Sequence, residues 1–234
     1  MVLERMDITK SEDALQLVLH RNRYDFVLAR LLPGQDVLEI GTGLGNLTRE
    51  LLPKCGSYAG VEYDPAACAE ARRRTGAEIL EADARELPFA DNRFSFIVCL
   101  EVLEHLGDYQ SGVRHIHRCL RPDGVAIVSV PYRRSGGPSR ANPYHVYEPG
   151  EDELVSLFHR LFANVETHYQ FFEETPWMTL ARRLHIRRLV GLDGIYADLS
   201  AGLPHAVSRL RIGPERQGLV EGLMVVASGK KPGA

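Results

Sequence analysis

The residues best suited to chemistry in this chain lie between Asp36 and Leu47, where an apolar run containing a carboxylate leads into a glycine-rich turn. The run Val-Leu-Glu-Ile is followed by glycines at positions 41, 43 and 45, and a helical pattern begins directly afterwards. Glycine lets the backbone turn sharply and approach a ligand with no side chain in between. Such a turn after a buried strand is typical of a ligand site at the carboxyl edge of a parallel sheet.

The charges around the turn indicate which ligand it holds. A dinucleotide fingerprint needs a third glycine at position 46, where this chain has Asn46. The carboxylate of Glu39 would also repel a pyrophosphate. S-adenosylmethionine carries an ammonium, a sulfonium and no phosphate, so this cation suits the acidic turn better than a dinucleotide does.

Further residues that can bind such a ligand follow the next predicted strands in chain order. Glu62 ends the second strand, where its acceptor oxygens can take both ribose hydroxyls, and Tyr63 can lie against adenine. Asp83 closes the third strand beside Ala84, whose backbone N–H can reach a ring nitrogen. A single acid at a strand end is more often a turn residue or a helix cap. The succession of these residues at several strand ends is what favours a cofactor site.

Strand and helix patterns alternate along most of the chain. Helices are predicted over residues 11–32, 47–52, 65–74, 110–120 and 152–162, and strands over 37–40, 58–62, 78–81, 94–100, 125–130, 165–170 and 219–228. This alternation predicts an α/β fold whose parallel sheet is covered by helices on both faces. We expect a single domain over residues 1–234, with residues 171–218 inserted before the last strand as a lid or substrate platform.

Composition and charge argue against several classes of protein. The chain has 28 basic and 31 acidic residues in 234, so binding to nucleic acid is not expected. Its four cysteines form no Cys-x-x-Cys pair, which argues against a zinc knuckle or a disulfide framework. The sequence shows no signal-peptide pattern and no apolar run of the ~20 residues that a membrane helix needs. We therefore expect a cytoplasmic protein, either a monomer or a homodimer.

Taken together, these segments resemble the class I S-adenosylmethionine-dependent methyltransferases. The resemblance rests on Val-Leu-Glu-Ile-Gly-Thr-Gly-Leu-Gly (37–45), Gly-Val-Glu-Tyr-Asp-Pro (60–65), Glu-Ala-Asp-Ala-Arg-Glu-Leu-Pro-Phe (81–89), Cys-Leu-Glu-Val-Leu-Glu-His-Leu (99–106) and Leu-Arg-Pro-Asp-Gly (120–124). It covers about residues 20–170 and the final strand. It implies a Rossmann-like, seven-stranded, mostly parallel sheet whose last strand is antiparallel. It also implies S-adenosylmethionine as the cofactor, bound by Tyr24, Glu39, Gly41, Thr42, Gly43, Glu62, Tyr63, Asp83, Ala84 and Leu100.

The chain departs from the family's usual pattern at two positions. Ser95 stands where the family often has aspartate, and Asp123 stands where it usually has glycine. Both positions lie away from the predicted transfer site, so neither puts cofactor binding in doubt.

Two histidines are candidates for the chemistry at the methyl acceptor. A sulfonium methyl is already activated, so the protein mainly has to orient an acceptor in line with it. An alcohol or phenol must also lose a proton, which a neighbouring base assists. His105 lies just beyond the fourth strand and His145 in the loop after the fifth, and we expect either to act as this base during transfer to an oxygen of a small molecule.

The segment from Glu101 to His105 could also contribute to a metal site. Ubiquinone-pathway O-methyltransferases and small-RNA terminal 2′-O-methyltransferases carry a similar Glu-x-x-Glu-His that binds a divalent metal. By this resemblance the ligands would be Glu101, Glu104, His105 and His145. A bound metal is possible but not expected, because similar segments occur in relatives with no known metal, and ligand types alone do not establish a site.

The acceptor itself is only weakly indicated. Residues 142–148, with residues 21–24, resemble a bacterial branch of the superfamily that acts on sugars, cell-surface glycan precursors and specialised metabolites. The arginines of residues 182–188 could grip an anionic substrate or rest on a lipid surface, but a solvated charged face is the more ordinary role for them. Alternatives left open are an RNA or protein methyltransferase, a non-catalytic S-adenosylmethionine-binding module and, more remotely, a dehydrogenase.

Overall fold

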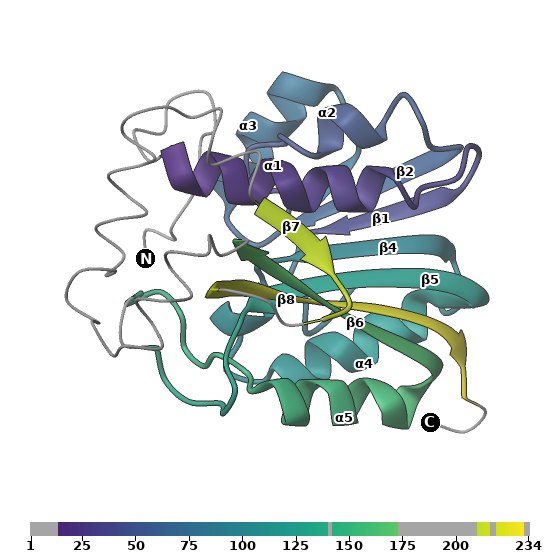
Figure 1. Ribbon diagram of the computed structural model, residues 1–234. Helices are drawn as coiled ribbons and strands as arrows, with labels where there is room; N and C mark the ends of the chain where they lie inside the picture. Colours follow the sequence, from purple (N-terminus) through teal and green to yellow (C-terminus); the bar gives the residue numbers. More distant parts are fainter. Residues whose placement is uncertain (1–13, 140–141, 173–209, 216–218, 232–234) are drawn as a thin grey trace, which may run out of the picture.

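The protein forms one mixed sheet flanked by helices, as Figure 1 shows for a computed structural model. The structure describes residues 14–139, 142–172, 210–215 and 219–231. The strands are β1 (Asp36–Ile40), β2 (Ser57–Glu62), β3 (Ile79–Glu81), β4 (Phe94–Leu100), β5 (Leu120–Pro131), β6 (Phe162–Phe172), β7 (Leu210–Gly213) and β8 (Leu219–Lys230). The helices are α1 (Ala14–Leu28), α2 (Thr48–Leu51), α3 (Pro65–Thr75), α4 (Tyr109–Cys119) and α5 (Glu151–Leu161), with a short 3₁₀ turn, η1 (Leu103–His105).

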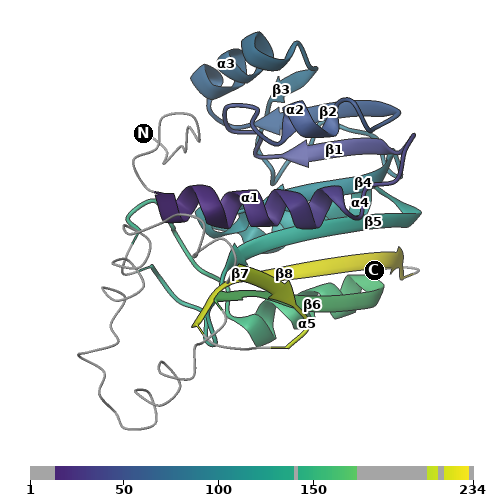
Figure 2. The same cartoon turned by 45° about the horizontal axis from the view of Figure 1, so that its top comes forward.

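The strand order places the ends of β1, β2 and β4 together. In the order β3-β2-β1-β4-β5-β8-β6-β7, the strands β1 to β5 run parallel, and β8 runs antiparallel to both of its neighbours (Figure 2). The chain order reverses at β1, since β2 lies on one side of it and β4 on the other. Ligands of open α/β sheets bind in the crevice at such a reversal, beyond the carboxyl ends of the strands.

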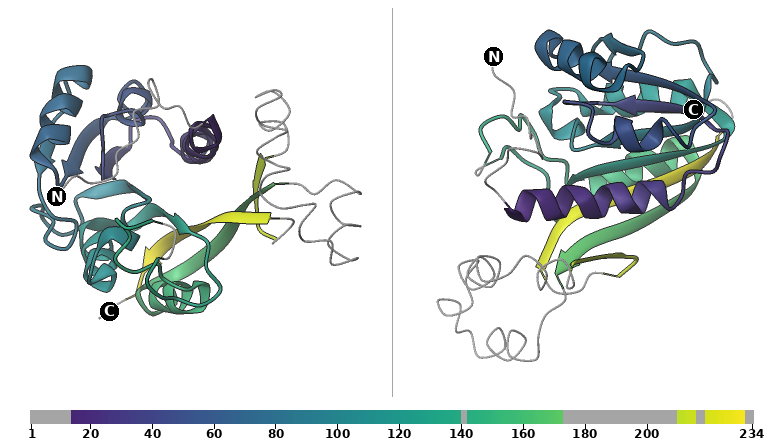
Figure 3. Two further views of the ribbon diagram at one scale, coloured as in Figure 1. Left: turned by 90° about the vertical axis from the view of Figure 1, so that its left-hand side faces the viewer. Right: turned by 90° about the horizontal axis from the view of Figure 1, so that it is seen from above.

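Both faces of the sheet are buried, as the near-continuous apolar strands predict. In β1, Val37 packs with α1 and α2, whereas the next residue, Leu38, packs with α4 and α5. Phe96 and Ile97 in β4 divide between the two faces in the same way. The left view of Figure 3 looks across the molecule, with α1 on one side of the sheet and α4 and α5 on the other. The predicted α/β fold with helices on both faces is therefore confirmed.

The strand count corrects the prediction of seven strands. An eighth strand, β7, pairs antiparallel with β6 at the edge of the sheet. It falls inside residues 171–218, where only an insertion was expected. The sequence Leu-Arg-Ile-Gly gives just one apolar-polar alternation, too little for a strand to be recognised from periodicity. Apart from residues 171–172, which end β6, and residues 210–215, the predicted insertion lies outside the described residues.

β5 begins earlier than its sequence pattern indicates. Phe94 pairs with Leu120 while Phe96 pairs with Val125, so the intervening residues bulge from the ladder. Gly124 sits in this bulge, where an added Cβ would lie 2.8 Å from Leu120 Cδ1 and 3.1 Å from the carbonyl of Ser95. Proline, aspartate and glycine at positions 122–124 led to the prediction of a strand start at 125, and they mark the bulge instead. No helix in the described part of the chain is both long and apolar enough to cross a bilayer.

Candidate functional site

The glycine turn after β1 brings bare backbone to the edge of the sheet. Gly41, Gly43 and Gly45 have φ of 76°, 55° and 79°, in the left-handed region that other residues rarely adopt. A Cβ added to Gly41 would lie 2.4 Å from Val102 Cγ2, so a larger residue there would displace Val102 as well as strain the backbone. The N–H groups of Gly41 and Thr42 both donate to the carbonyl of Val61, which fixes the turn against β2.

Gly43 provides a test of this turn with a matched control. A Cβ at Gly43 or at Gly34 would meet no atom within 4 Å, and both residues have positive φ, but only Gly43 borders the cavity described below. We expect Gly43→Ala and Gly34→Ala to lose similar stability, about 1–2 kcal/mol. Only Gly43→Ala should weaken binding of S-adenosylhomocysteine, by ~10-fold or more, in calorimetry. Equal affinities in the two variants would contradict this assignment of the turn.

A cavity of about 290 Å³ opens over this turn and the neighbouring strand ends. All ten residues predicted to contact a cofactor line it, namely Tyr24, Glu39, Gly41, Thr42, Gly43, Glu62, Tyr63, Asp83, Ala84 and Leu100. Residues contributed by α1 and by the segment after β4 complete the wall, among them His20, Glu101, Val102 and His105. The predicted cofactor residues, which lie far apart in sequence, therefore share one cavity, although contact with a cofactor remains a proposal.

Glu39 is a buried carboxylate in this wall. One of its oxygens, Oε2, accepts hydrogen bonds from Thr48 Oγ1 at 2.7 Å and from the Tyr58 hydroxyl at 2.6 Å. Burial raises the pKa of Glu39 to about 7, and the two hydrogen bonds only partly oppose that rise. Near neutral pH the group is therefore divided between its acid and its anion, and a cation placed beside it would favour the anion.

This shift predicts that cofactor binding releases a proton. Below about pH 7 most Glu39 is protonated, so a cationic ligand must displace that proton, and affinity should rise as the pH increases from about 6 to about 8. Calorimetry with S-adenosylmethionine in buffers of different ionisation enthalpy measures the released protons directly. Glu39→Gln should abolish both the release and this part of the pH dependence. An affinity that fell over the same range would contradict the prediction.

Glu62 is held by the backbone in a position that leaves acceptor capacity for a ligand. Gly43 N–H donates to Oε2 at 2.8 Å, and Asp64 N–H donates to Oε1 at 3.1 Å. Each carboxylate oxygen can accept more than one hydrogen bond, so ribose hydroxyls can be added to this arrangement. Asp64 caps α3 by accepting from Ala66 N–H and Ala67 N–H, and this cap fixes the chain directly after Glu62.

Asp83 has a partner that the sequence analysis missed. The guanidinium of Arg85 pairs with its carboxylate at 2.6 Å and lowers the pKa of Asp83 below the ordinary value. Arg85 also lines the cavity, so a ligand amine at Asp83 would share the carboxylate with this arginine. Arg85 stands two residues after Asp83, and this short spacing was the sequence signal that could have identified the pair. Tyr63, 57% exposed, lies at the same part of the cavity wall.

The structure distinguishes the two predicted bases. His105 lines the cavity, and its Nδ1 lies 3.0 Å from the carbonyl of Tyr144. A carbonyl only accepts, so the proton is on Nδ1 and the lone pair of the neutral ring is on Nε2. His145 does not line this cavity. Its Nδ1 contacts Glu148 Oε1 at 2.8 Å, and its Nε2 accepts from the amide of Asn142 at 2.9 Å.

Three of the four predicted metal ligands come together. Ligand atoms of Glu104, His105 and His145 all lie within 4.8 Å of one another. Glu104 is fully buried, and neither of its carboxylate oxygens has a hydrogen-bond partner among the described residues. Burial, with the charge of Glu101 nearby, raises the pKa of Glu104 well above its ordinary value. Glu101 is engaged elsewhere, with Arg23 at 3.2 Å and Ser129 at 2.7 Å.

His20 is a cavity residue that the sequence analysis did not select. It lies one helical turn before Tyr24 on α1, and the two rings pack edge to face with centroids 6.0 Å apart. Burial, with the positive charge of Arg23, lowers the pKa of His20 to about 3, so the ring is neutral at physiological pH. The spacing of four residues from a predicted cofactor residue on a helix was the signal that could have found it.

Comparisons with known proteins agree with this architecture. A family model for a methyltransferase domain matches residues 38–128. A probable S-adenosylmethionine-dependent methyltransferase of Mycobacterium tuberculosis is 37% identical over 142 residues, which cover 58% of this chain and 52% of that protein. The ubiquinone/menaquinone biosynthesis C-methyltransferase UbiE of Coxiella burnetii is 26% identical over 206 residues, covering 82% of this chain and 81% of that enzyme.

A solved structure shows the same fold. A possible histamine N-methyltransferase from Thermotoga maritima superimposes with a TM-score of 0.61 at 20% identity, covering 92% of both chains. The family-model match over residues 38–128 and these two relatives support the class I S-adenosylmethionine-dependent methyltransferase superfamily, which the sequence motifs predicted. The predicted Rossmann-like fold is confirmed by the superposition, and the relatives support the predicted cofactor. The chain spans about half the length of the first curated relative.

Proposed function

We propose that this protein transfers the methyl group of S-adenosylmethionine to an oxygen of a small molecule. The observation that supports the proposal most is the cavity over the glycine turn, whose wall carries three carboxylates from successive strand ends, those of Glu39, Glu62 and Asp83. An acidic wall favours a sulfonium and an ammonium and disfavours a phosphorylated nucleotide such as NAD. The match of residues 38–128 to a methyltransferase-domain model and the likeness to the mycobacterial protein support the same donor.

His105 is the base that we propose for the transfer. Its Nε2 carries the lone pair of the neutral ring, because Nδ1 is bonded to the Tyr144 carbonyl. During the reaction the acceptor O–H proton passes to Nε2 while the oxygen forms a bond to the methyl carbon. The bond from sulfur to that carbon breaks, and its electron pair stays on sulfur as the neutral thioether. Positioned proton transfer of this kind contributes roughly 10²- to 10⁴-fold to rate.

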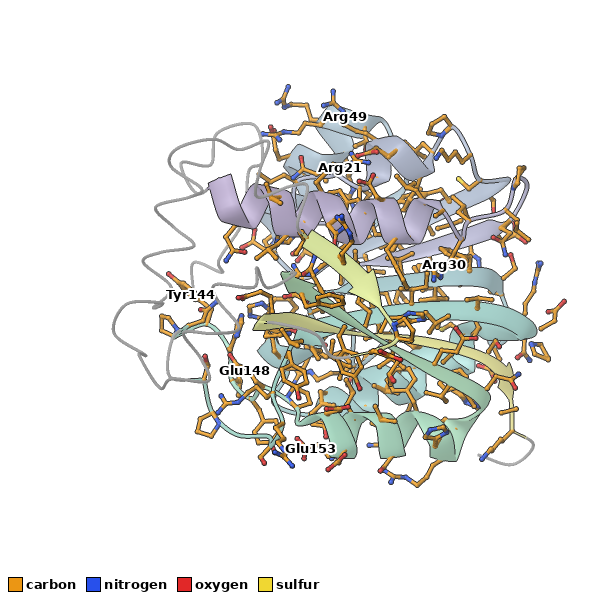
Figure 4. All side chains as sticks on the ribbon, viewed as in Figure 1. Arg21, Arg30, Arg49, Tyr144, Glu148 and Glu153 are labelled. Carbon is orange, nitrogen blue, oxygen red and sulfur yellow. The ribbon has the colours of Figure 1, made fainter. Side chains whose placement is uncertain are left out.

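The loop between β5 and α5, which contains Tyr144, supports His105 in this role. His145 packs its ring edge to face against His105, with centroids 4.8 Å apart, and the Glu148 carboxylate holds Nδ1 of His145. Glu148 in turn pairs with Arg133 at 2.8 Å. Figure 4 shows Tyr144 and Glu148 on the loop that joins β5 to α5. We propose that His145 orients His105 and does not itself remove the proton.

A divalent cation held by Glu104, His105 and His145 is a second candidate. The buried Glu104 oxygens favour it, because they have no partner among the described residues, and one carboxylate with two imidazoles is a reasonable donor set for a transition metal. A cation there would lower the pKa of an acceptor hydroxyl. Activity that survives EDTA and dialysis would exclude this role, whereas loss restored by Mn²⁺ or Zn²⁺ would support it.

Acceptors other than an oxygen atom are alternatives to this proposal. The Coxiella relative is named for C-methylation in quinone biosynthesis, so a carbon acceptor is the alternative that a comparison favours. RNA or protein acceptors, and a module that binds the cofactor without catalysis, remain alternatives as well. A cytoplasmic location and a monomeric or homodimeric state also stay predictions.

The experiment offers methyl-labelled S-adenosylmethionine with catechol, UDP-glucose and a short-chain hydroquinone as separate acceptors. Label in an ether product supports oxygen transfer, and the ¹³C shift of the new methyl distinguishes O–CH₃ from C–CH₃. Transfer only to carbon, or only to RNA or protein in an extract, would contradict the proposed acceptor. Tight binding of S-adenosylhomocysteine with no transfer to any acceptor would favour the binding module.

A further inference from the structure

Glu101 has an unusual backbone conformation at the point where β4 ends. Its φ is 54°, and Asn92 is the one other non-glycine residue with positive φ in the described ranges. Side chains other than glycine rarely adopt this conformation, which persists only where surrounding contacts hold it. The turn at Glu101 sends the chain from β4 into η1, and η1 carries His105 to the cavity wall.

Three contacts hold Glu101 in this conformation. Its N–H donates to the carbonyl of Ser129 at 3.0 Å, and the Ser129 hydroxyl donates to Oε1 at 2.7 Å. The other carboxylate oxygen lies 3.2 Å from Nη2 of Arg23. Ser129 belongs to β5 and Arg23 to α1, so the residue is fixed by the next strand and by the helix over the sheet.

Arg23 is buried and depends on this carboxylate. Its side chain is 4% exposed, and its Nε has no hydrogen-bond partner among the described residues. Glu221 on β8 is close enough for the arginine to oppose the rise that burial causes in the pKa of Glu221. An unpaired guanidinium at this depth would be strongly unfavourable, and Glu101 provides the ion-pair contact that compensates it.

We infer that Arg23 and Glu101 are positioning residues that fix His105 relative to the bound cofactor. The residue after Arg23 is Tyr24, which lines the cavity, and Glu101 begins the turn that leads to His105. The ion pair therefore connects the helix beside the cofactor to the segment that carries the base. The effect on turnover rests on the proposed function, whereas the effect on the position of His105 does not.

The test is the double variant Arg23→Leu/Glu101→Gly. Both single variants are also made, so that the four proteins form a double-mutant cycle. The double variant removes both charges and the left-handed strain together, so it should fold, with a Tm no lower than that of the wild type. Because Glu101 lines the cavity, the affinity of the double variant for S-adenosylmethionine is measured first, and turnover is then compared at saturating cofactor. Turnover of the acceptor found in the labelling assay should fall by ~10²-fold, as expected when a catalytic group is misplaced by about 1 Å.

A second readout separates positioning from general stability. The imidazole NMR signals of His105, assigned with His105→Asn, should shift by more than their line width in the double variant with S-adenosylhomocysteine bound. The matched control is Arg21→Gln/Glu50→Gln, which removes an exposed ion pair of 2.5 Å that also ties α1 to α2. Figure 4 shows Arg21 on the same helix. The control should leave both turnover and the His105 signals unchanged.

The outcomes are distinguishable. Wild-type turnover and unshifted His105 signals in the double variant would overturn the inference. Shifted signals in the Arg21→Gln/Glu50→Gln control would overturn it too, because any loosening of α1 would then suffice. If the wild-type protein methylates no acceptor, the proposed function fails, and the His105 signals alone decide whether Arg23 and Glu101 set the position of that ring.

Discussion

Replacing His105 by asparagine is expected to slow methyl transfer by roughly 10²- to 10⁴-fold while leaving the affinity for S-adenosylmethionine within about threefold of the wild type. The reason is that His105 lines the cavity and its Nε2 is the atom that we assign to proton removal, whereas the proposed cofactor contacts come mainly from other residues. Stopped-flow or quenched single-turnover measurements with labelled cofactor separate the chemical step from binding and product release.

Two further histidine variants serve as a control and a comparison for that result. His159→Asn, on the exposed side of α5, should leave transfer unchanged. His145→Asn should reduce transfer by ~10-fold, because the ring only supports His105. Equal losses in the His105 and His145 variants, with metal dependence, would favour the cation site over the general base. Transfer unchanged by His105→Asn would remove this residue from the mechanism.

Glu62→Gln is expected to weaken binding of S-adenosylhomocysteine by roughly 10²-fold or more. The carboxylate is proposed to accept two ribose hydroxyls, and a hydrogen bond to a charged group contributes about 1.5–3 kcal/mol. The amide retains one acceptor oxygen and introduces an N–H₂ group that faces the N–H of Gly43 or Asp64, so one existing bond is also lost. Isothermal calorimetry gives the affinity directly, and the ligand-induced rise in Tm should shrink with it.

Glu81 provides the control for this prediction. It ends β3 directly beside Glu62 in the sheet, and it is exposed and does not line the cavity. Glu81→Gln should therefore bind S-adenosylhomocysteine within about threefold of the wild type. A similar loss of affinity in both variants would indicate a general effect of charge at this edge and would contradict a ribose contact at Glu62.

The residues at the strand ends could be predicted because their positions follow from local patterns. A buried strand, a turn and a helix place Glu39, Glu62 and Asp83 at one edge of any parallel sheet, whatever the rest of the chain does. The boundaries of β4 were predicted from its apolar run alone, since only Ser95 interrupts it. Secondary structure therefore identified the residues that now line one cavity.

The contacts between distant segments could not be predicted in this way. Arg23 and Glu101 are far apart in the chain. Glu101 belongs to the Glu-x-x-Glu-His segment, but nothing local indicates that its partner is Arg23. The difference between His105 and His145 depends on loop geometry, because Tyr144 and Asn142 determine which ring nitrogen is occupied. β7 was missed because four residues at a sheet edge carry too little periodicity.

The position of β8 in the sheet has a consequence for folding during synthesis. This strand is synthesised after all the others, yet it lies between β5 and β6 and pairs with both. A nascent chain on the ribosome therefore exposes two unpaired strand edges until residue 230 has emerged, and such edges can pair with other polypeptides. A fragment that stops before Leu219 should accordingly aggregate during expression and require a chaperone to remain in solution.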